Sequence, residues 1–132
     1  DEAVLVGAGN LGRALLSYSG FEESGIKIVA AFDCDDYLVG QSLFGKQVLP
    51  VAKLSDLCHR MHILIGIIAV PASQAQEVCD LLVSAGVAAI WNFAPTHLSV
   101  PDEVLVKNEN LAAALAILSQ DLSDRLVKGA CL

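Results

Sequence analysis

Residues 3–21 are AVLVGAGNLGRALLSYSGF, a short apolar run followed by three closely spaced glycines and a longer apolar pattern. Its four apolar residues at 3–6 predict a short buried strand. The apolar spacing over 10–18 predicts a helix. The residues of that helix expected to face the core are Leu11, Leu15, Leu16 and Tyr18. A strand that turns at once into a helix is the first unit of an α/β protein.

The turn between these elements carries Gly7, Gly9 and Gly12 in the spacing GxGxxG. In such a turn the first glycine permits the bend and the second lets the backbone approach a pyrophosphate. The third lets helix and strand pack closely. Free N–H groups and the positive end of the helix dipole then hold the phosphate charge. We therefore predict that a cofactor contacts Gly7, Ala8, Gly9, Asn10, Leu11 and Gly12, although glycines also mark ordinary loops.

A second strand is expected at 26–32, and Asp33 follows it directly, 21 residues after Gly12. A carboxylate at that place accepts hydrogen bonds from ribose hydroxyls and repels a 2′-phosphate. This favours NAD(H) over NADP(H) as the cofactor. Asp35 and Asp36 are close enough to compete for the role, but Asp33 comes immediately after the apolar run.

The rest of the chain continues the alternation of strands and helices. Segment 62–70 is apolar on both faces, as a central strand of a parallel sheet is. Gly86 marks the C-terminal end of the helix expected at 72–85. Further strands are expected at 47–50, 87–93 and 103–106, helices at 51–60, 72–85 and 109–127, and a loop with at most one helical turn at 33–48. The predicted fold class is α/β, a doubly wound, mostly parallel Rossmann sheet.

Ligand contacts in such a sheet also come from the carboxyl ends of the strands near the topological switch point. AVPAS (69–73) and NFAPTHL (92–98) follow two of the predicted strands. The Asn92 amide could hold either a carboxamide or a neighbouring loop, and ordinary strand-to-helix turns are the alternative for both segments. The candidate residues here are Val70, Pro71, Asn92, Phe93, Ala94 and Pro95.

Charge and hydropathy exclude several classes of protein. The 132 residues carry 15 acidic and 8 basic side chains, for a net charge of −7, so direct binding of nucleic acid is not expected. The longest apolar run, 63–70, is too short for a bilayer, which needs about 20 residues. No basic stretch followed by an apolar one opens the chain, so we expect no membrane and a cytoplasmic location.

Metal binding and catalysis are also not expected. The cysteines form no CxxC pair and are interpreted as reduced packing residues: Cys34, Cys58, Cys79 and Cys131. His59 and His62 have i, i+3 spacing but no accompanying ligands. His97 could act as a general base in hydride transfer, but dehydrogenases usually add a second, substrate-binding domain.

The motifs together resemble those of the bacterial redox-sensing transcriptional repressor family Rex. The segments that carry the resemblance are GAGNLGRALLSYSGF (7–21), AAFDCD (30–35), VPASQAQEVCDLLVSAGV (70–87) and NFAPTHLSVPDEVLVKNENLAAALAILS (92–119). The resemblance implies a sensor of the NADH/NAD+ ratio that NADH releases from operator DNA. It implies a homodimer whose subunits have an N-terminal winged-helix domain and a C-terminal Rossmann domain. Tyr18 matches a family tyrosine near the nicotinamide.

Two departures from the family pattern stand out. Asp1 and Glu2 lead straight into the first strand, so these residues contain no winged helix. Either that part has been trimmed away, which we expect, or this protein never had a DNA-binding half. Asn110 stands where the family commonly has an aspartate, and an amide cannot make the ionic contact of a carboxylate. This departure concerns the coupling of redox state to domain rearrangement and leaves the residues expected to bind the cofactor unchanged.

The terminal helix carries leucines at spacings of four, three, four and four: Leu111, Leu115, Leu118, Leu122 and Leu126. This stripe can bury one face against its own sheet. Ile117 widens the apolar surface, and the resemblance implies a helix exchanged between subunits. We therefore predict an NAD(H)-binding domain over 1–108 and a dimerisation helix over 109–132. The alternatives are the nucleotide-binding half of an NAD-dependent oxidoreductase and a nucleotide-gated regulatory module.

Overall fold

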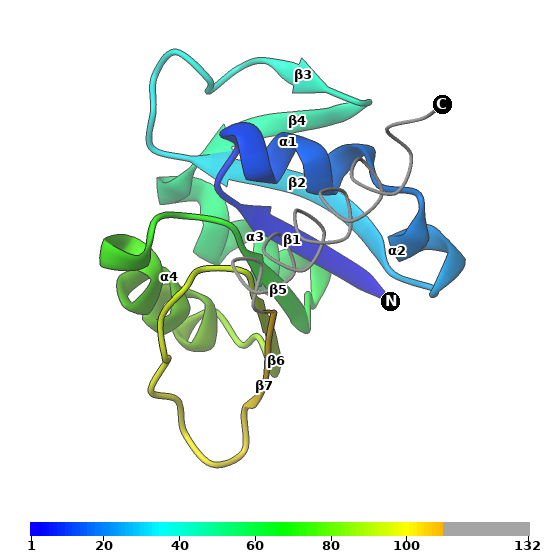
Figure 1. Ribbon diagram of the computed structural model, residues 1–132. Helices are drawn as coiled ribbons and strands as arrows, with labels where there is room; N and C mark the ends of the chain where they lie inside the picture. Colours follow the sequence, from blue (N-terminus) through cyan, green and yellow to red (C-terminus); the bar gives the residue numbers. More distant parts are fainter. Residues whose placement is uncertain (110–132) are drawn as a thin grey trace, which may run out of the picture.

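The computed structural model describes residues 1–109, and within them a seven-stranded sheet has the order β3-β4-β2-β1-β5-β6-β7 (Figure 1). The strands are β1 (Glu2–Val6), β2 (Lys27–Asp33), β3 (Ser42–Leu43), β4 (Lys46–Pro50), β5 (Ile65–Ile68), β6 (Ala89–Asn92) and β7 (Leu105–Asn108). The β3–β4 pair is antiparallel, and the other five pairs are parallel. The mostly parallel sheet predicted from the sequence is confirmed.

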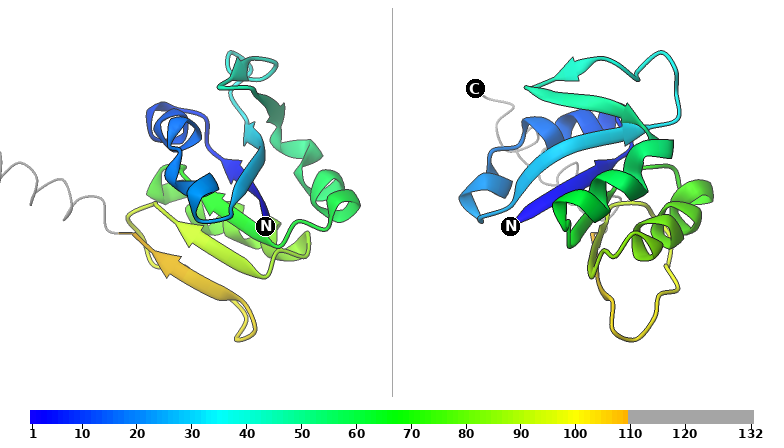
Figure 2. Two further views of the ribbon diagram at one scale, coloured as in Figure 1. Left: turned by 90° about the vertical axis from the view of Figure 1, so that its right-hand side faces the viewer. Right: turned by 180° about the vertical axis from the view of Figure 1, so that it is seen from behind.

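Helices cover both faces of this sheet (Figure 2). The helical segments are α1 (Asn10–Ser17), α2 (Gly20–Glu23), the 3-10 turn η1 (Val51–Lys53), α3 (Leu54–Met61) and α4 (Ala72–Ser84). The first two lie on one face, and α3 and α4 lie on the other. The sheet is therefore doubly wound, as predicted.

The sequence of β1 explains its central place. Ala3 and Leu5 belong to the core on the α1 side, and Val4 and Val6 belong to the core on the α3 and α4 side. All four are almost completely inaccessible to solvent. A strand that is apolar on both faces must lie inside a sheet that is covered on both faces.

The strand order reverses between β1 and β5. The chain moves outward from β1 to β2 and β4, then crosses back through α3 to pair β5 with the free side of β1. Connections on either side of this point leave in opposite directions, which opens a crevice at the carboxyl ends of β1 and β5. The glycine turn lies at that crevice, and the N-terminus lies at the opposite end of β1 (Figure 1).

Several predicted boundaries were wrong. The strand expected at 62–70 is confined to Ile65–Ile68, because His62 adopts the left-handed conformation (φ 53°) that ends α3. The helix expected at 51–60 begins as a 3-10 turn. The strand expected at 103–106 lies two residues further on, where Leu105–Asn108 pairs with β6.

Two short elements were missed, and one side chain was misplaced. The 33–48 segment contains β3, which forms a hairpin with β4, and α2 follows α1 directly. Tyr18, expected to face the core, is 61% exposed because α1 ends at Ser17. The predicted terminal helix over 109–127 lies outside the described residues, except for residue 109.

Candidate functional site

The turn that joins β1 to α1 uses its three glycines in different ways. Gly7 has a φ of +106°, and a Cβ there would lie 2.6 Å from the carbonyl oxygen of Ala69. A Cβ at Gly12 would overlap the carbonyl oxygen of Gly7, so α1 packs this close only without a side chain. A Cβ at Gly9 would meet nothing within 4 Å. The first and third glycines therefore shape the turn, and the second leaves its outer surface bare.

The N-terminus of α1 faces out of this turn. The helix begins after Gly9 with no side-chain cap and no acidic residue in its first turn. Arg13 N–H donates to Gly9 O at 2.9 Å, so the N–H groups of residues 10–12 have no acceptor within the helix. The Asn10 side chain is exposed, and Leu11 packs against the core on the α1 side. This end of α1 can hold an anionic group such as a phosphate.

Asp33, at the end of β2, is tied to the glycine turn. Its Oδ2 accepts a hydrogen bond from the N–H of the buried Ala8 at 2.8 Å, and its Oδ1 accepts one from Asp35 N–H at 2.9 Å. A carboxylate has about four lone-pair sites, so both oxygens can still accept from a ligand. Asp35 instead accepts from Tyr37 N–H, and Asp36 is exposed. Of the three aspartates considered, Asp33 is the one bonded to the turn.

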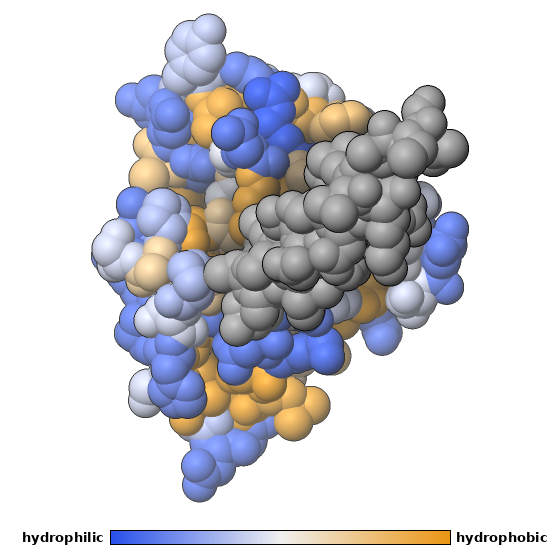
Figure 3. Space-filling model, in the orientation of Figure 1, coloured by the Kyte–Doolittle hydropathy of each residue, from blue (hydrophilic) through white to orange (hydrophobic). Residues whose placement is uncertain are grey.

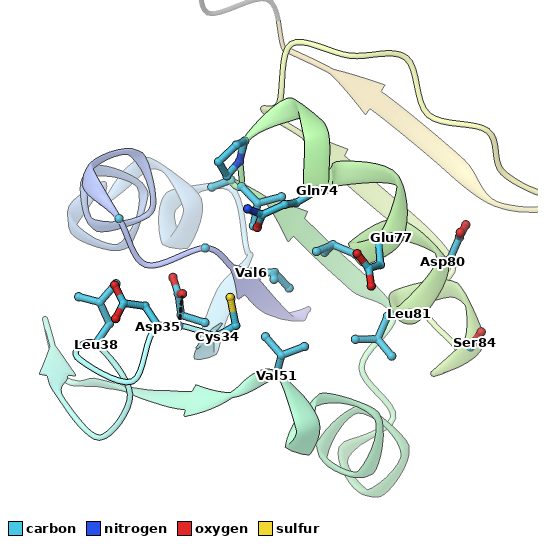
Figure 4. A pocket seen from close by; sticks show the side chains of 17 residues that line it. Val6, Cys34, Asp35, Leu38, Val51, Gln74, Glu77, Asp80, Leu81 and Ser84 are labelled. Atoms are coloured by element: carbon cyan, nitrogen blue, oxygen red, sulfur yellow. Dashed lines mark hydrogen bonds between the residues drawn. The ribbon is translucent and has the colours of Figure 1, made fainter.

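A cleft of about 800 Å³ opens beside the turn, on the side of the sheet covered by α3 and α4 (Figure 4). One wall is formed by α4 and the other by the chain that follows β2 together with η1. Of the residues predicted to bind a cofactor, the cleft brings together Gly7, Gly9, Asp33, Val70 and Pro71. Segments that lie up to 64 positions apart in the chain therefore meet at one site.

The charged groups of this cleft are acidic. Its described lining contains Asp33, Asp35, Glu77 and Asp80, and it contains no lysine, arginine or histidine. A phosphate on a ribose hydroxyl beside Asp33 would face like charge with no cation to balance it. The cleft therefore favours a nucleotide whose ribose carries no phosphate.

The apolar walls of the cleft were missed by sequence reasoning. Leu38 and Val51 line one side, and Val78 and Leu81 line the other. A signal existed for α4, because Gln74, Val78 and Leu81 have the spacing of one helix face. No such signal existed for Leu38 and Val51, whose positions depend on how the β3–β4 hairpin folds back onto β2.

Asn92, at the end of β6, is fully buried and fastens the neighbouring loop. Its Nδ2 donates to Thr96 O and to Asn108 Oδ1, both at 3.0 Å. Its Oδ1 accepts from Ala94 N–H at 3.0 Å. Of the two roles that the sequence left open for this amide, the structure shows the contact with a neighbouring loop.

The other residues predicted at this strand end lie outside the cleft lining. Phe93 is buried in the core on the α1 side, Ala94 is buried in the opposite core, and Pro95 is exposed. All three follow directly after Asn92, which pairs with Ile68 at the end of β5. They therefore lie at the carboxyl edge of the sheet, and their contact with a cofactor stays a prediction.

Tyr18 lies at the opposite end of α1 from the glycine turn. Its ring packs over Gly20 and meets Phe21 edge to face, with the centroids 5.4 Å apart. Phe21 meets Trp91 at 5.2 Å, and Trp91 meets Phe93 at 5.6 Å. This row of rings joins Tyr18 to the end of β6 along the α1 side of the sheet. The proximity of Tyr18 to a nicotinamide stays a prediction.

The described cysteines have two different environments. Cys58 and Cys79 are buried, and burial raises the pKa of both thiols; the Asp80 carboxylate raises the pKa of Cys79 further. Cys34 is exposed and lines the cleft. Cys131 lies outside the described residues. Packing therefore accounts for the two buried thiols, whereas Cys34 is reachable from solvent.

The histidines are dispersed. The ring Nδ1 of His59 lies 3.3 Å from Ala85 O, His62 ends α3, and His97 is exposed away from the cleft lining. Across residues 1–109, no three His, Cys, Asp or Glu side chains are grouped so that they could hold a metal ion. No helix in this part of the chain is long and apolar enough to span a membrane.

Comparison with known proteins identifies related sequences. A family model described as "CoA binding domain" matches residues 1–96. The redox-sensing transcriptional repressor Rex of Carboxydothermus hydrogenoformans is 49% identical over 116 residues, which are 88% of this chain and 56% of that protein. The chain thus spans a little over half the length of this relative.

Solved structures of RSP, a Rex-family repressor, are similar in three forms. Its crystal structure has a TM-score of 0.84 at 38% identity, and the match covers 99% of this chain and 63% of RSP. RSP in complex with β-NADH matches with a TM-score of 0.83 at 37% identity over 99% and 63%. RSP with β-NAD+ and operator DNA matches with a TM-score of 0.83 at 37% identity over 98% and 60%.

Proposed function

Because the chain belongs to the CoA-binding domain family and resembles Rex repressors along nearly its whole length, we propose that it is the NAD(H)-binding, redox-sensing domain of a transcriptional repressor. The observation that carries the proposal is the bare glycine turn tied to Asp33 at the mouth of the cleft. A backbone cradle without a Cβ, beside a carboxylate, suits a diphosphate joined to a ribose.

Different residues of the chain are proposed to bind the diphosphate, the ribose and the nicotinamide of the dinucleotide. The outer surface at Gly9 and the amides of residues 10–12 hold the diphosphate. The Asp33 carboxylate accepts from the ribose hydroxyls with the lone pairs that Ala8 and Asp35 leave open. Val70 and Pro71 close the cleft from the end of β5. The nicotinamide supplies the redox chemistry that is sensed, and residues 92–95 with Tyr18 are proposed to lie nearest to it.

The acidic lining separates NAD(H) from two other nucleotides. NADP(H) carries a 2′-phosphate on its adenosine ribose, and coenzyme A carries a 3′-phosphate on its own adenosine ribose. Either phosphate would lie beside Asp33, in a lining with no basic side chain among the described residues. The proposed ligand is therefore NAD(H), although the family model is described by coenzyme A.

The sensing step is proposed from the relatives. RSP has been solved with NADH and, separately, with NAD+ and operator DNA, which supports a repressor whose DNA-bound state is compatible with NAD+. We expect NADH to release the full-length repressor from operator DNA. DNA contact belongs to a winged-helix part outside this chain, because these 132 residues have a net charge of −7.

The assembly follows the same proposal. We propose that residues 1–108 form the cofactor domain and that residues 109–132, of which the structure describes only residue 109, form a helix exchanged in a homodimer. Leu105, at the start of β7, is 72% exposed, and an apolar patch lies at the lower edge of the molecule in Figure 3, which supports a subunit contact at this edge. The protein acts in the cytoplasm and is not an enzyme. His97, the candidate general base, is exposed and lies outside the cleft lining.

Calorimetric titration of the chain with NADH, NAD+, NADPH and coenzyme A tests this function. We expect NADH and NAD+ to bind, and the two phosphorylated nucleotides to bind at least about tenfold more weakly. Absorbance of NADH should stay constant when small aldehydes or keto acids are added. Tight binding of coenzyme A alone, or steady oxidation of NADH, would overturn the proposal.

A further inference from the structure

The far end of the cleft, beyond Asp33, is apolar on both walls and contains an inward-facing carboxylate. Leu38 and Val51 line one wall, and Val78 and Leu81 line the other. Two apolar walls suit the flat faces of an aromatic base. If the diphosphate lies at the glycine turn and the ribose at Asp33, the base of the nucleotide extends into this end.

Glu77 directs its carboxylate into this space from α4, whereas Asp80 and Ser84 point away from it (Figure 4). The Asp80 carboxylate is also engaged, because its Oδ1 accepts from Gln76 Nε2 at 2.9 Å. Within residues 1–109, no hydrogen bond or ion pair is made by the Glu77 carboxylate, although other acidic residues of the lining accept bonds from the backbone.

An ionised carboxylate can only accept hydrogen bonds. Adenine has an exocyclic amino group, which donates, whereas guanine presents a carbonyl oxygen at the corresponding position, which accepts. Hypoxanthine has the same carbonyl oxygen as guanine. A carboxylate opposite position 6 of the base can therefore accept from the amino group of adenine, whereas in the two 6-oxopurines it faces a carbonyl oxygen, and their nearest donor is the N1–H of the neighbouring ring position. No basic side chain of the described lining offsets the repulsion between that oxygen and the carboxylate.

We propose that Glu77 is a specificity-determining residue that selects adenine over 6-oxopurines by accepting a hydrogen bond from the amino group of the base. This inference rests on the proposed function, because it takes the ligand to be a dinucleotide held at the glycine turn. It adds the identity of the base to a site whose phosphate and ribose contacts come from other elements.

The test compares NADH with reduced nicotinamide hypoxanthine dinucleotide, whose purine has an oxo group in place of the 6-amino group and a proton on the adjacent N1. Calorimetric titrations use the unchanged chain, Glu77→Gln and the matched control Asp80→Asn. The unchanged chain should bind NADH about tenfold more tightly, the strength of one charged hydrogen bond. Glu77→Gln should bring the two affinities within about twofold, because an amide both donates and accepts. Asp80→Asn should keep the original ratio.

Each alternative result has a separate meaning. Equal affinities for the two dinucleotides in the unchanged chain, or an unaltered ratio in Glu77→Gln, would overturn the role of Glu77 and leave the proposed function intact. A ratio lost equally in Asp80→Asn would show that general charge, and not Glu77, sets the preference. Failure of the unchanged chain to bind either dinucleotide would reject the proposed function and this inference together. Thermal denaturation of both variants, at exposed positions, checks that they fold.

Discussion

The carboxylate of Asp33 accepts a hydrogen bond from the backbone N–H of Ala8 at 2.8 Å, across 25 positions of the chain. The bond joins the end of β2 to the turn after β1, two strands that are paired in parallel. Asp33 therefore stabilises the turn, in addition to making the ribose contact proposed for it. It holds the glycine turn in shape before any nucleotide arrives.

Replacing Asp33 with alanine should affect the empty protein as well as the complex. We expect the affinity for NADH to fall by at least about tenfold and the free energy of unfolding to fall by about 1 kcal/mol, because the Ala8 N–H loses its acceptor. Hydrogen exchange at the Ala8 amide should become faster in the absence of nucleotide. The difference in affinity between NADH and NADPH should become smaller.

The matched control for Asp33→Ala is Asp36→Ala, which removes a nearby exposed carboxylate that is not part of the cleft lining. Asp36→Ala should leave the affinity for NADH and the free energy of unfolding unchanged. Unaltered exchange at Ala8 in Asp33→Ala would show that the turn keeps its shape without the carboxylate.

Substitutions of Gly9 and Gly12 should have different effects on the free energy of unfolding and on the affinity for NADH. Gly9→Ala meets nothing within 4 Å and has an ordinary φ of −74°, so its free energy of unfolding should be unchanged or up to about 1 kcal/mol higher. Its affinity for NADH should nevertheless drop, because the new methyl group occupies the phosphate side of the turn. Gly12→Ala should lose about 1–3 kcal/mol of stability, because its methyl group would overlap Gly7 O. Urea denaturation and calorimetry measure the two effects, and normal NADH binding by Gly9→Ala would contradict the assignment of the phosphate site.

Asn92 should behave as a structural residue of the buried core. Asn92→Ala breaks three hydrogen bonds and leaves Ala94 N–H and the carboxamide of Asn108 without their partner. We expect a loss of about 3 kcal/mol in the free energy of unfolding. Thr96→Val is the control, because Asn92 hydrogen-bonds to the backbone carbonyl oxygen of Thr96, which valine keeps. A loss below about 1 kcal/mol would indicate that the loop after β6 is held by other contacts.

Thiol reactivity should report the occupancy of the cleft. Cys34 is exposed and lines the cleft, whereas Cys58 and Cys79 are buried. In a Cys131→Ser background, a thiol reagent should modify Cys34 first, and saturating NADH should slow that reaction. Peptide mass spectrometry identifies the modified residue. Equal rates with and without NADH would place the nucleotide outside this cleft.

The two buried thiols should make stability depend on alkaline pH. Burial raises the pKa of Cys58 and Cys79 above the ordinary thiol value of 9.0. The folded form therefore keeps both thiols neutral at a pH where the unfolded chain ionises them. Their contribution is fully present below the ordinary thiol pKa and is lost as pH rises through the raised values. Unfolding free energies measured from pH 7 to 10 should fall less steeply in Cys58→Ala/Cys79→Ala, and parallel slopes in the two proteins would contradict this account.

The parts of the site that were predictable are those set by local sequence. The glycine turn and Asp33 were located because backbone conformation and the end of an apolar run depend on neighbouring residues. Tyr18 was placed wrongly toward the core because α1 stops one residue earlier, and helix ends depend on packing more than on pattern. The two possible roles of Asn92 could not be separated, because its partner Asn108 is 16 positions away.

The doubly wound sheet and the position of its glycine turn follow from the sequence, because apolar periodicity and glycine geometry act over a few residues. Which side chains surround the cleft depends instead on the packing of distant elements. Leu38, Val51 and Glu77 meet there from the turn after β2, the 3-10 turn η1 and one face of α4. Such contacts depend on how the elements pack against one another, and no local pattern encodes that packing.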